Sequence, residues 1–351
     1  MKKVFNRVLI DGLSGMALGL FATLIVGTII QQIGSLVGGS MGDMIYLIGK
    51  VAAAMTGAGI GVGVCCKFKS SPLVTVSAGV AGMVGAFASK LLAGTVLVEG
   101  AIVLAGPGEP LGAFLAAYVG MELGLLVSGK TKVDILVTPL VTIGAGSVVG
   151  LVLGPPISQF MIALGAMINW GTEQQPFLMG IIVSVLMGMI LTLPISSAAL
   201  GVILDLSGLA AGAATVGCCC NMVGFAVASY RENKVGGLVA QGIGTSMLQV
   251  PNIMRKPVIW VPAILTSAIL GPVSTMILHM TNNATGSGMG TAGLVGQIMT
   301  WQTMTAVESP AVVLTKILAI QFLLPAVITL LISELMRKKG WIQYGDMKLD
   351  V

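Results

Sequence analysis

The sequence has 351 residues, of which 56% are hydrophobic and only 9% are charged, and its mean hydropathy is +1.00. Soluble domains carry about 25% charged residues, so this composition excludes a soluble globular domain and predicts an all-α polytopic membrane protein in a lipid bilayer. The net charge of +5 comes from Lys and Arg at the ends of apolar segments and does not indicate a nucleic-acid partner. No gap between these segments is long enough for a soluble domain, so we expect a single membrane domain over residues 1–351.

About 8–10 transmembrane helices are predicted, from apolar stretches near or above the roughly 20 residues that a helix needs to cross a bilayer. In chain order, the expected helices are 9–35, 45–65, 72–95, 111–128, 134–154, 178–203, 207–229, 257–280 and 309–335.

The segment 178–203 and several shorter ones are expected to re-enter the membrane as hairpins or to lie at its surface. Residues 156–169 are too short to span, and Pro194 interrupts 178–203. A full crossing of 178–203 stays open, but a hairpin that turns back at Pro194 agrees better with the charge of the next loop. Non-helical backbone at membrane depth occurs only where it is buried in protein or lines a water-filled cavity. We therefore expect a solute pathway at three brief or Gly-rich pieces: 96–110, 235–250 and 286–300.

Basic residues predict the orientation of the chain in the cell membrane, because cytoplasmic loops carry an excess of Lys and Arg. This pattern puts the N- and C-termini in the cytoplasm. The first apolar segment has no A-x-A-like cleavage site, so we expect an uncleaved helix rather than a signal peptide. The basic clusters are Lys2, Lys3 and Arg7; Lys67 and Lys69; Lys130 and Lys132; Arg231 and Lys234; Arg255 and Lys256; and Arg337, Lys338 and Lys339.

A weak internal repeat predicts two halves, 1–170 and 171–351. The stretch GAGIGVGVCC (57–66) is similar to AGAATVGCCC (211–220), and a basic loop and a Gly-rich stretch follow each copy. Both copies have the same charge orientation, which favours a direct duplication. Duplicated halves with interrupted segments are typical of transporters that bind their substrate between the halves.

The five cysteines do not indicate a metal or redox site. Cys65 and Cys66, and Cys218 to Cys220, lie in apolar segments without C-x-x-C spacing or a neighbouring histidine. We interpret them as small packing residues and expect no metal and no cofactor. The motifs G-x-S-x-G, H-E-x-x-H and the Walker loop are also missing, so the sequence does not predict an enzyme.

The stretch GPGEPLGAFL (106–115) combines a carboxylate with a broken backbone. Pro107 and Pro110 remove two N–H donors and disfavour a helix in the residues before them. Pro110 fits the first turn of the next helix, which puts Glu109 at its N-cap side, where free N–H groups and the helix dipole stabilise a negative charge. Two interpretations stay open: a capped loop at the outer surface, or a carboxylate in a cavity that accepts hydrogen bonds from solute hydroxyl groups.

The other candidate substrate-binding residues are polar groups in the apolar second half. Glu308 again places a carboxylate before a proline that opens a helix, and His279 is the only histidine; both could instead lie at the outer surface. Glu122 and Lys316 also lie in apolar segments, where snorkelling explains them. Amides and a few carboxylates suit a small, neutral, hydroxyl-rich solute better than an ion. The amide candidates are Asn221, Gln241, Gln249, Asn252 and Asn282.

GPGEP resembles the G-x-x-E-P motif of the membrane subunits (IIC components) of sugar phosphotransferase systems. The stretch from Pro176 to Asn252 resembles a stand-alone, IIC-like family described as perfringolysin O regulator-like, and the resemblance covers nearly the whole chain. It implies that Glu109 contacts a sugar at the tip of a re-entrant element, and it leaves a homodimer open. Two features depart from sugar IIC proteins: the motif lies in the first third of the chain, and the IIA histidine and IIB cysteine domains are missing. Any phosphoryl transfer would therefore need separate IIA and IIB proteins.

We therefore predict a membrane transporter of a small polar solute, with sugars or sugar-like compounds as the leading class, that works by alternating access. The alternative is a solute-sensing membrane regulator that binds without transport and acts through a cytoplasmic partner. A channel is disfavoured, because few charged residues are available to line a pore.

Overall fold

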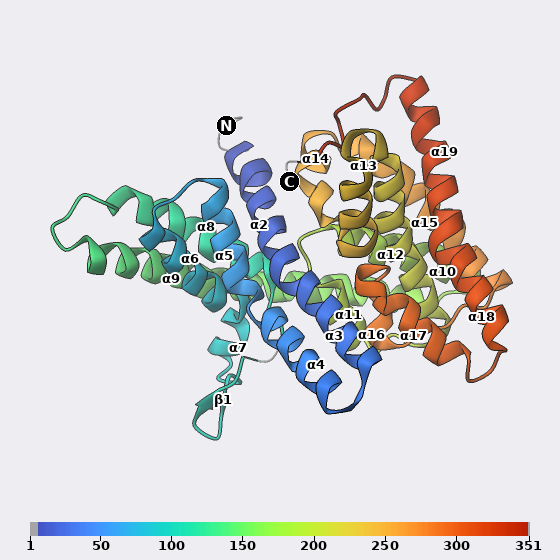
Figure 1. Cartoon of the computed structure of the whole chain (residues 1–351), viewed down its shortest axis with the longest axis horizontal. Coiled ribbons are helices and arrows are strands. Elements are labelled where there is room, and N and C mark those ends of the chain that lie inside the picture. Colours follow the sequence, from blue (N-terminus) through green and yellow to red (C-terminus); the bar gives the residue numbers. More distant parts are fainter. Residues whose placement is uncertain (1–5, 105, 350–351) are drawn as a thin grey trace. The chain divides into compact units, whose positions relative to one another are not determined.

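The computed structural model describes residues 6–104 and 106–349, and it separates into two compact units, Met1–Met161 and Ile162–Val351 (Figure 1). Helices make up nearly all the regular structure of the described residues, and the only strands among them are two residues long. The boundary between the units falls within a long helix, close to the predicted division at residue 170. A duplication that relates the two units stays a prediction.

The first unit consists of helices and one small β-hairpin. Helix α5 packs against α2, α6 and α8. The hairpin turns at Glu99 and Gly100, which both have positive φ, and it lies within the segment 96–110 that was expected to re-enter the membrane. The elements are α2 (Leu13–Leu20), α3 (Val26–Val37), α4 (Gly39–Ala54), α5 (Thr56–Lys67), α6 (Pro72–Ala86), α7 (Ala88–Leu92), β1 (Leu97–Val98), β2 (Ala101–Ile102), α8 (Pro110–Val127) and the larger part of α9 (Asp134–Thr172).

In the second unit α12 is the central helix, since it packs against α10, α15 and α19 and nearly all of its residues are buried (Figure 1). Several of the other helices are short and are separated by irregular turns. The elements after α9 are α10 (Pro176–Thr192), α11 (Ser197–Ile203), α12 (Gly208–Ala228), α13 (Tyr230–Val239), α14 (Val250–Arg255), α15 (Val261–Pro272), α16 (Ala284–Ser287), α17 (Val295–Met304), α18 (Pro310–Ile317) and α19 (Leu324–Lys338).

By length and composition, six helical segments of the described chain can cross a membrane, or seven if the bent pair α4–α5 counts as one span. This confirms an all-α polytopic membrane protein. The apolar helices α6 and α10 are shorter, and the predicted 8–10 spans would require them to cross as well. The six segments are Ile10–Val37, Pro110–Val127, Asp134–Thr172, Gly208–Ala228, Pro257–Ile277 and Pro310–Lys338.

The predicted single helix over 45–65 is wrong. Helices α4 and α5 meet at an angle of 55°, and Met55 joins them with φ −81° and ψ 10°, outside the helical range. The hydroxyl of Thr56 donates a hydrogen bond of 2.6 Å to the carbonyl of Ala53. This bond satisfies one of the carbonyl groups that a helix end leaves free.

The predicted helix end at residue 154 and the separate segment 156–169 are also wrong. Helix α9 continues through Pro155 and Pro156 to Thr172. Each proline removes one N–H donor, but its fixed φ of about −65° is a helical value, so the backbone can remain helical.

The predicted break at Pro194 is confirmed. Helix α10 ends at Thr192, residues 193–196 are not helical, and α11 begins at Ser197. A return of the chain to the same side of the membrane at this break stays a prediction.

Small residues allow the helices of the second unit to approach closely, as is common where helices pack in lipid. A Cβ atom added to Gly217 in α12 would lie 2.6 Å from Cα of Ser184 in α10. One added to Gly180 in α10 would lie 2.8 Å from the carbonyl carbon of Gly271 in α15. Since these are main-chain contacts, side-chain movement cannot relieve them. Gly144 in α9, by contrast, has open space where a Cβ would lie.

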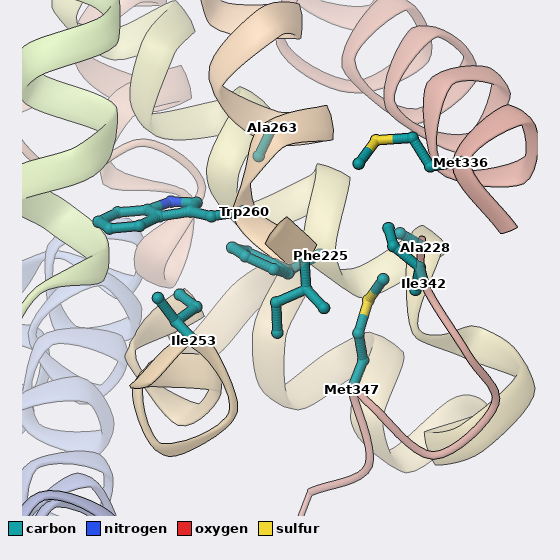
Figure 2. Packing of buried hydrophobic residues seen from close by; sticks show 9 residues of the cluster. Phe225, Ala228, Ile253, Trp260, Ala263, Met336, Ile342 and Met347 are labelled. Carbon is teal, nitrogen blue, oxygen red and sulfur yellow. The ribbon is translucent and has the colours of Figure 1, made fainter. Parts of the chain in front are cut away.

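An apolar core of the second unit includes the segment that follows α19. Figure 2 shows Phe225 and Ala228 from α12 and Trp260 from the turn before α15, together with Ile342 and Met347. The last two residues are 1% and 0% exposed. The chain after α19 therefore contributes two side chains to this core.

Candidate functional site

Glu109 is the N-cap residue of α8, as predicted, with Pro110 in the first turn of the helix. Gly106 and Gly108 precede it with φ of +82° and +73°, values that glycine adopts without steric strain. The N–H of Glu109 donates a hydrogen bond of 2.8 Å to the main-chain oxygen of Ala86, and a Cβ on Gly108 would lie 2.8 Å from that oxygen. Within the first unit, this loop is therefore held against the end of α6.

The carboxyl group of Glu109 combines burial with a free acceptor. Its Oε1 is buried without a hydrogen-bond partner among the described residues, and the side chain forms no capping hydrogen bond. Glu109 precedes the span Pro110–Val127, and burial raises the pKa of its carboxyl to about 7, while the backbone N–H of Leu111 acts in the opposite direction. A buried acceptor without a partner costs about 1–3 kcal/mol. A ligand hydroxyl that donates to Oε1 would remove this cost.

The other predicted site residues lie in the second unit, and the structure places them in separate groups. Asn221 is fully buried in α12. Its Oδ1 accepts hydrogen bonds from Trp260 Nε1 at 2.8 Å and from Thr192 Oγ1 at 3.1 Å. Its Nδ2 donates to the carbonyl of Gly217 at 3.2 Å and to Ser267 Oγ at 3.4 Å. Both ends of this amide are thus bonded to protein.

Gln241, Gln249 and Asn252, three of the amide candidates, form a continuous chain of hydrogen bonds that we call the amide ladder. Gln249 Nε2 donates to Gln241 Oε1 at 2.8 Å, and Asn252 Nδ2 donates to Gln249 Oε1 at 2.9 Å. All three residues are buried, with at most 4% exposure. Such a network fixes the positions of its members, since Gln241 and Gln249 are held at both ends and Asn252 is held by its Nδ2 group.

Both N–H groups of each ladder amide are occupied by protein acceptors. Gln241 Nε2 donates to Ser229 Oγ and to the carbonyl of Gly237, both at 2.9 Å. The acceptors outside the ladder for the other two amides are the main-chain oxygens of Met347, 3.0 Å from Gln249 Nε2, and Lys348, 2.8 Å from Asn252 Nδ2. The segment after α19 therefore contacts the ladder directly.

Asn282 and His279 are near in sequence but differ in environment. Asn282 is 1% exposed, and its Nδ2 donates to Thr215 Oγ1 at 2.7 Å and to the carbonyl of Gly296 at 3.1 Å. His279 is exposed and has a positive φ of 47°. The structure does not place the histidine in the polar network of Asn282.

Glu308 lies in the turn between α17 and α18 and pairs with Lys316, whose Nζ is 2.7 Å from Glu308 Oε1. Nζ also donates to the carbonyl of Leu278 at 2.8 Å. Oε2 of Glu308 is buried without a partner among the described residues, so this carboxylate offers a free acceptor as Glu109 does. In the first unit Glu122 pairs with Arg7 at 2.7 Å.

Some residues of these networks were not predicted from the sequence. Trp260 and Thr192 complete the bonding of Asn221, and the side chain of Asn233 binds the main chain of the segment after α19. A buried indole N–H needs an acceptor, which is a general signal for Trp260. Nothing in the local sequence indicates the role of Asn233, because its partner Met347 is 114 positions away.

Two cavities of the second unit, each of about 420 Å³, lie beside α13. This is within the usual range of about 300–1,000 Å³ for small-molecule pockets. Val227, Leu238, Leu330, Arg231 and Glu334 are among the residues lining the first cavity. The second is lined by Glu232, Asn233, Gly236, Gly237, Lys348 and Leu349. Glu109 lines neither cavity.

Comparison with known proteins identifies the family of this membrane protein. The family described as "Phosphotransferase system, EIIC" matches residues 10–349, nearly the whole chain. A search of curated proteins finds no match. The EIIC component is the membrane transporter part of its system, which agrees with the multi-pass helical fold and with the motif around Glu109. The chain belongs to the EIIC family of the phosphotransferase system.

Proposed function

We propose that this protein moves a small sugar or sugar-like solute across the cell membrane by alternating access, and that Glu109 binds the solute. The observation that carries the proposal is the buried, unpartnered Oε1 of Glu109 in a broken backbone segment. This segment carries the G-x-x-E-P pattern, and the EIIC family match extends over it.

The position of Glu109 suits a hydroxyl-bearing ligand. At the N-terminus of α8 the helix dipole and the backbone N–H of Leu111 partly offset the effect of burial on the carboxylate. A solute O–H can donate to Oε1 and supply the hydrogen bond that the protein leaves unmade. A hydrogen bond to a charged acceptor contributes about 1.5–3 kcal/mol, enough to select a hydroxylated solute over one without that group.

The second unit also contains buried polar groups, among which Glu308 has a free acceptor. The amides of Asn221, Asn282 and the amide ladder are bonded to protein in this conformation. In the proposed cycle, some of these protein partners are exchanged for solute hydroxyl groups when the conformation changes.

Three ion pairs support the orientation expected from the basic clusters, in which the termini lie in the cytoplasm. They join Arg231 to Glu334 at 2.9 Å, Arg337 to Glu232 at 2.8 Å, and Lys256 to Asp346 at 2.6 Å. The pairs bring three of the basic clusters close to α13, to α19 and to the chain that follows it. Because such clusters are typical of the cytoplasmic side, we infer that this end of the second unit and the C-terminus are cytoplasmic.

Uptake by the purified protein in proteoliposomes tests the proposal, with radiolabelled glucose, galactose, mannitol and N-acetylglucosamine as probes. We expect saturable uptake of at least one probe and its loss in Glu109→Gln. Glu99→Gln is the matched control, since Glu99 is an exposed carboxylate of the β-hairpin. Binding without accumulation would support a sensor instead. If no probe binds or is taken up, or if Glu109→Gln transports like Glu99→Gln, the proposal is wrong.

Phosphoryl transfer would require IIA and IIB proteins supplied separately. We expect uptake without modification of the solute when the protein is alone, and a phosphorylated product only when these partners are added. Size-exclusion chromatography with light scattering tests whether the protein is a homodimer.

A further inference from the structure

The chain after α19 is bound to the second unit over residues 341–349, which we call the strap. Ile342 and Met347 enter the apolar core with 1% and 0% exposure (Figure 2). Tyr344, between them, is 76% exposed. The strap therefore lies along the surface of the unit and is anchored by two apolar side chains.

Amide side chains recognise the main chain of the strap. The carbonyl of Met347 accepts from Asn233 Nδ2 at 2.8 Å and from Gln249 Nε2 at 3.0 Å. The next carbonyl, that of Lys348, accepts from Asn252 Nδ2 at 2.8 Å. The N–H of Leu349 donates to Asn233 Oδ1 at 2.9 Å. These contacts recognise main-chain groups, which a ligand with several hydroxyl groups could replace one for one.

An ion pair and a cavity accompany the strap. Lys256 Nζ lies 2.6 Å from Asp346 Oδ2, and both side chains are partly exposed, at 32% and 19%. The second cavity beside α13, of about 420 Å³, is bounded on one side by Lys348 and Leu349. Glu232, another lining residue, has a buried Oε2 without a partner among the described residues. The strap thus forms one wall of a cavity that also contains an unpaired acceptor.

We propose that the strap is a reversible lock on the amide ladder. When it is bound, its carbonyl groups occupy one N–H each of Gln249 and Asn252; when it is released, these donors become available to solute hydroxyl groups. The lock deepens the proposed function and rests on it, because it gives the ladder a solute-binding role. It assigns the strap a role in regulation as well as in packing.

The surroundings of the strap suit reversible release. It binds to the segment Ala240–Arg255, which consists of short helical turns rather than one continuous helix. Lys234, in the neighbouring α13, has a non-helical backbone with φ of 53°. Elements with few continuous backbone hydrogen bonds open at lower free energy than long helices do. A change at the strap can therefore move this segment without unfolding the central helix α12.

Competition between strap and solute has a reciprocal consequence. If release of the strap favours solute binding, solute binding must favour release of the strap by the same factor. Exposure of the strap can therefore be measured independently of transport, and its response to a solute reports on the lock.

The test compares Asp346→Ala, which removes the ion pair to Lys256, with Tyr344→Ala, which changes an exposed side chain of the same segment. Both are combined with Leu349→Cys as a reporter, since Leu349 is 8% exposed and a maleimide reaches it only when the strap opens. Cys66 is replaced by serine because it is the exposed cysteine of the described chain, the other four being buried.

Asp346 Oδ2 also accepts a hydrogen bond of 2.6 Å from the N–H of Gln343. We expect Asp346→Ala to speed labelling at position 349 and to tighten binding of the transported sugar, each by about three- to tenfold, because it removes a partly exposed ion pair and this hydrogen bond. Tyr344→Ala should have the same labelling rate and the same affinity for the sugar as the parent protein. Saturating sugar should also speed labelling in the parent.

Two other results would overturn the lock. Faster labelling with unchanged or weaker sugar binding would show that the strap has only a structural role, while the proposed function would still stand. If none of glucose, galactose, mannitol and N-acetylglucosamine binds to the parent or to Asp346→Ala, both the proposed function and the lock are wrong.

Discussion

Replacement of Asn221 by leucine removes the acceptor that Trp260 Nε1 contacts at 2.8 Å. Thr192 keeps two partners, the carbonyl of Gly188 at 3.1 Å and Ser246 Oγ at 2.8 Å, so its hydroxyl is not orphaned. The indole N–H is therefore the main group left buried without a partner. We expect a loss in the free energy of unfolding of about 1–3 kcal/mol, the usual penalty for such a group. A hydrogen bond between membrane helices contributes only about 0.6 kcal/mol on average, so a larger loss points to the unpaired indole.

A double-mutant cycle with Trp260→Phe isolates this effect, because phenylalanine has no N–H to leave unpaired. In that background Asn221→Leu should cost less than about 1 kcal/mol, which gives a coupling energy between the two positions. Unfolding by SDS in mixed micelles, followed by far-ultraviolet circular dichroism, measures each variant. Equal losses in both backgrounds would refute the assignment of the penalty to Trp260.

Three further outcomes are expected. Gly217→Ala should lower stability by about 1–3 kcal/mol through overpacking, whereas Gly144→Ala should be neutral or stabilising, and thermal unfolding in detergent distinguishes them. Lys316→Met should lower the melting temperature more than the double variant with Glu308→Gln does, because the double variant leaves no unpaired carboxylate. Since burial raises the pKa of Glu109 from 4.5 to about 7, the folded state binds more protons between these values, and stability relative to Glu109→Gln should fall as pH rises through this range. If the difference in stability between the protein and Glu109→Gln does not change from pH 4 to 8, this pKa is wrong.

Features set by local sequence were predictable. Composition indicated membrane helices, Pro194 marked the break after α10, and the spacing of Pro107 and Pro110 placed Glu109 at the start of a helix. In each case, the physical cause lies within a few residues: apolar length, a missing N–H donor, or a fixed φ.

Features set by distant contacts could not be predicted from the sequence. The bend at Met55 has no proline to signal it, and Pro155 and Pro156, which do signal a break, lie inside a continuous helix. The predicted amide candidates were identified by polarity alone, which does not show whether their N–H and carbonyl groups are free to bind a ligand. Asn252 finds its acceptor at Lys348, 96 positions away, and no local pattern encodes such a pairing.

The central claim is that Glu109 contacts the transported solute. The most direct measurement is an experimental structure of the protein with its transported sugar bound. A sugar hydroxyl should lie within about 2.5–3.0 Å of Glu109 Oε1, the distance of an O–H···O hydrogen bond. A sugar bound elsewhere in the protein, with Oε1 still unpartnered, would contradict the claim.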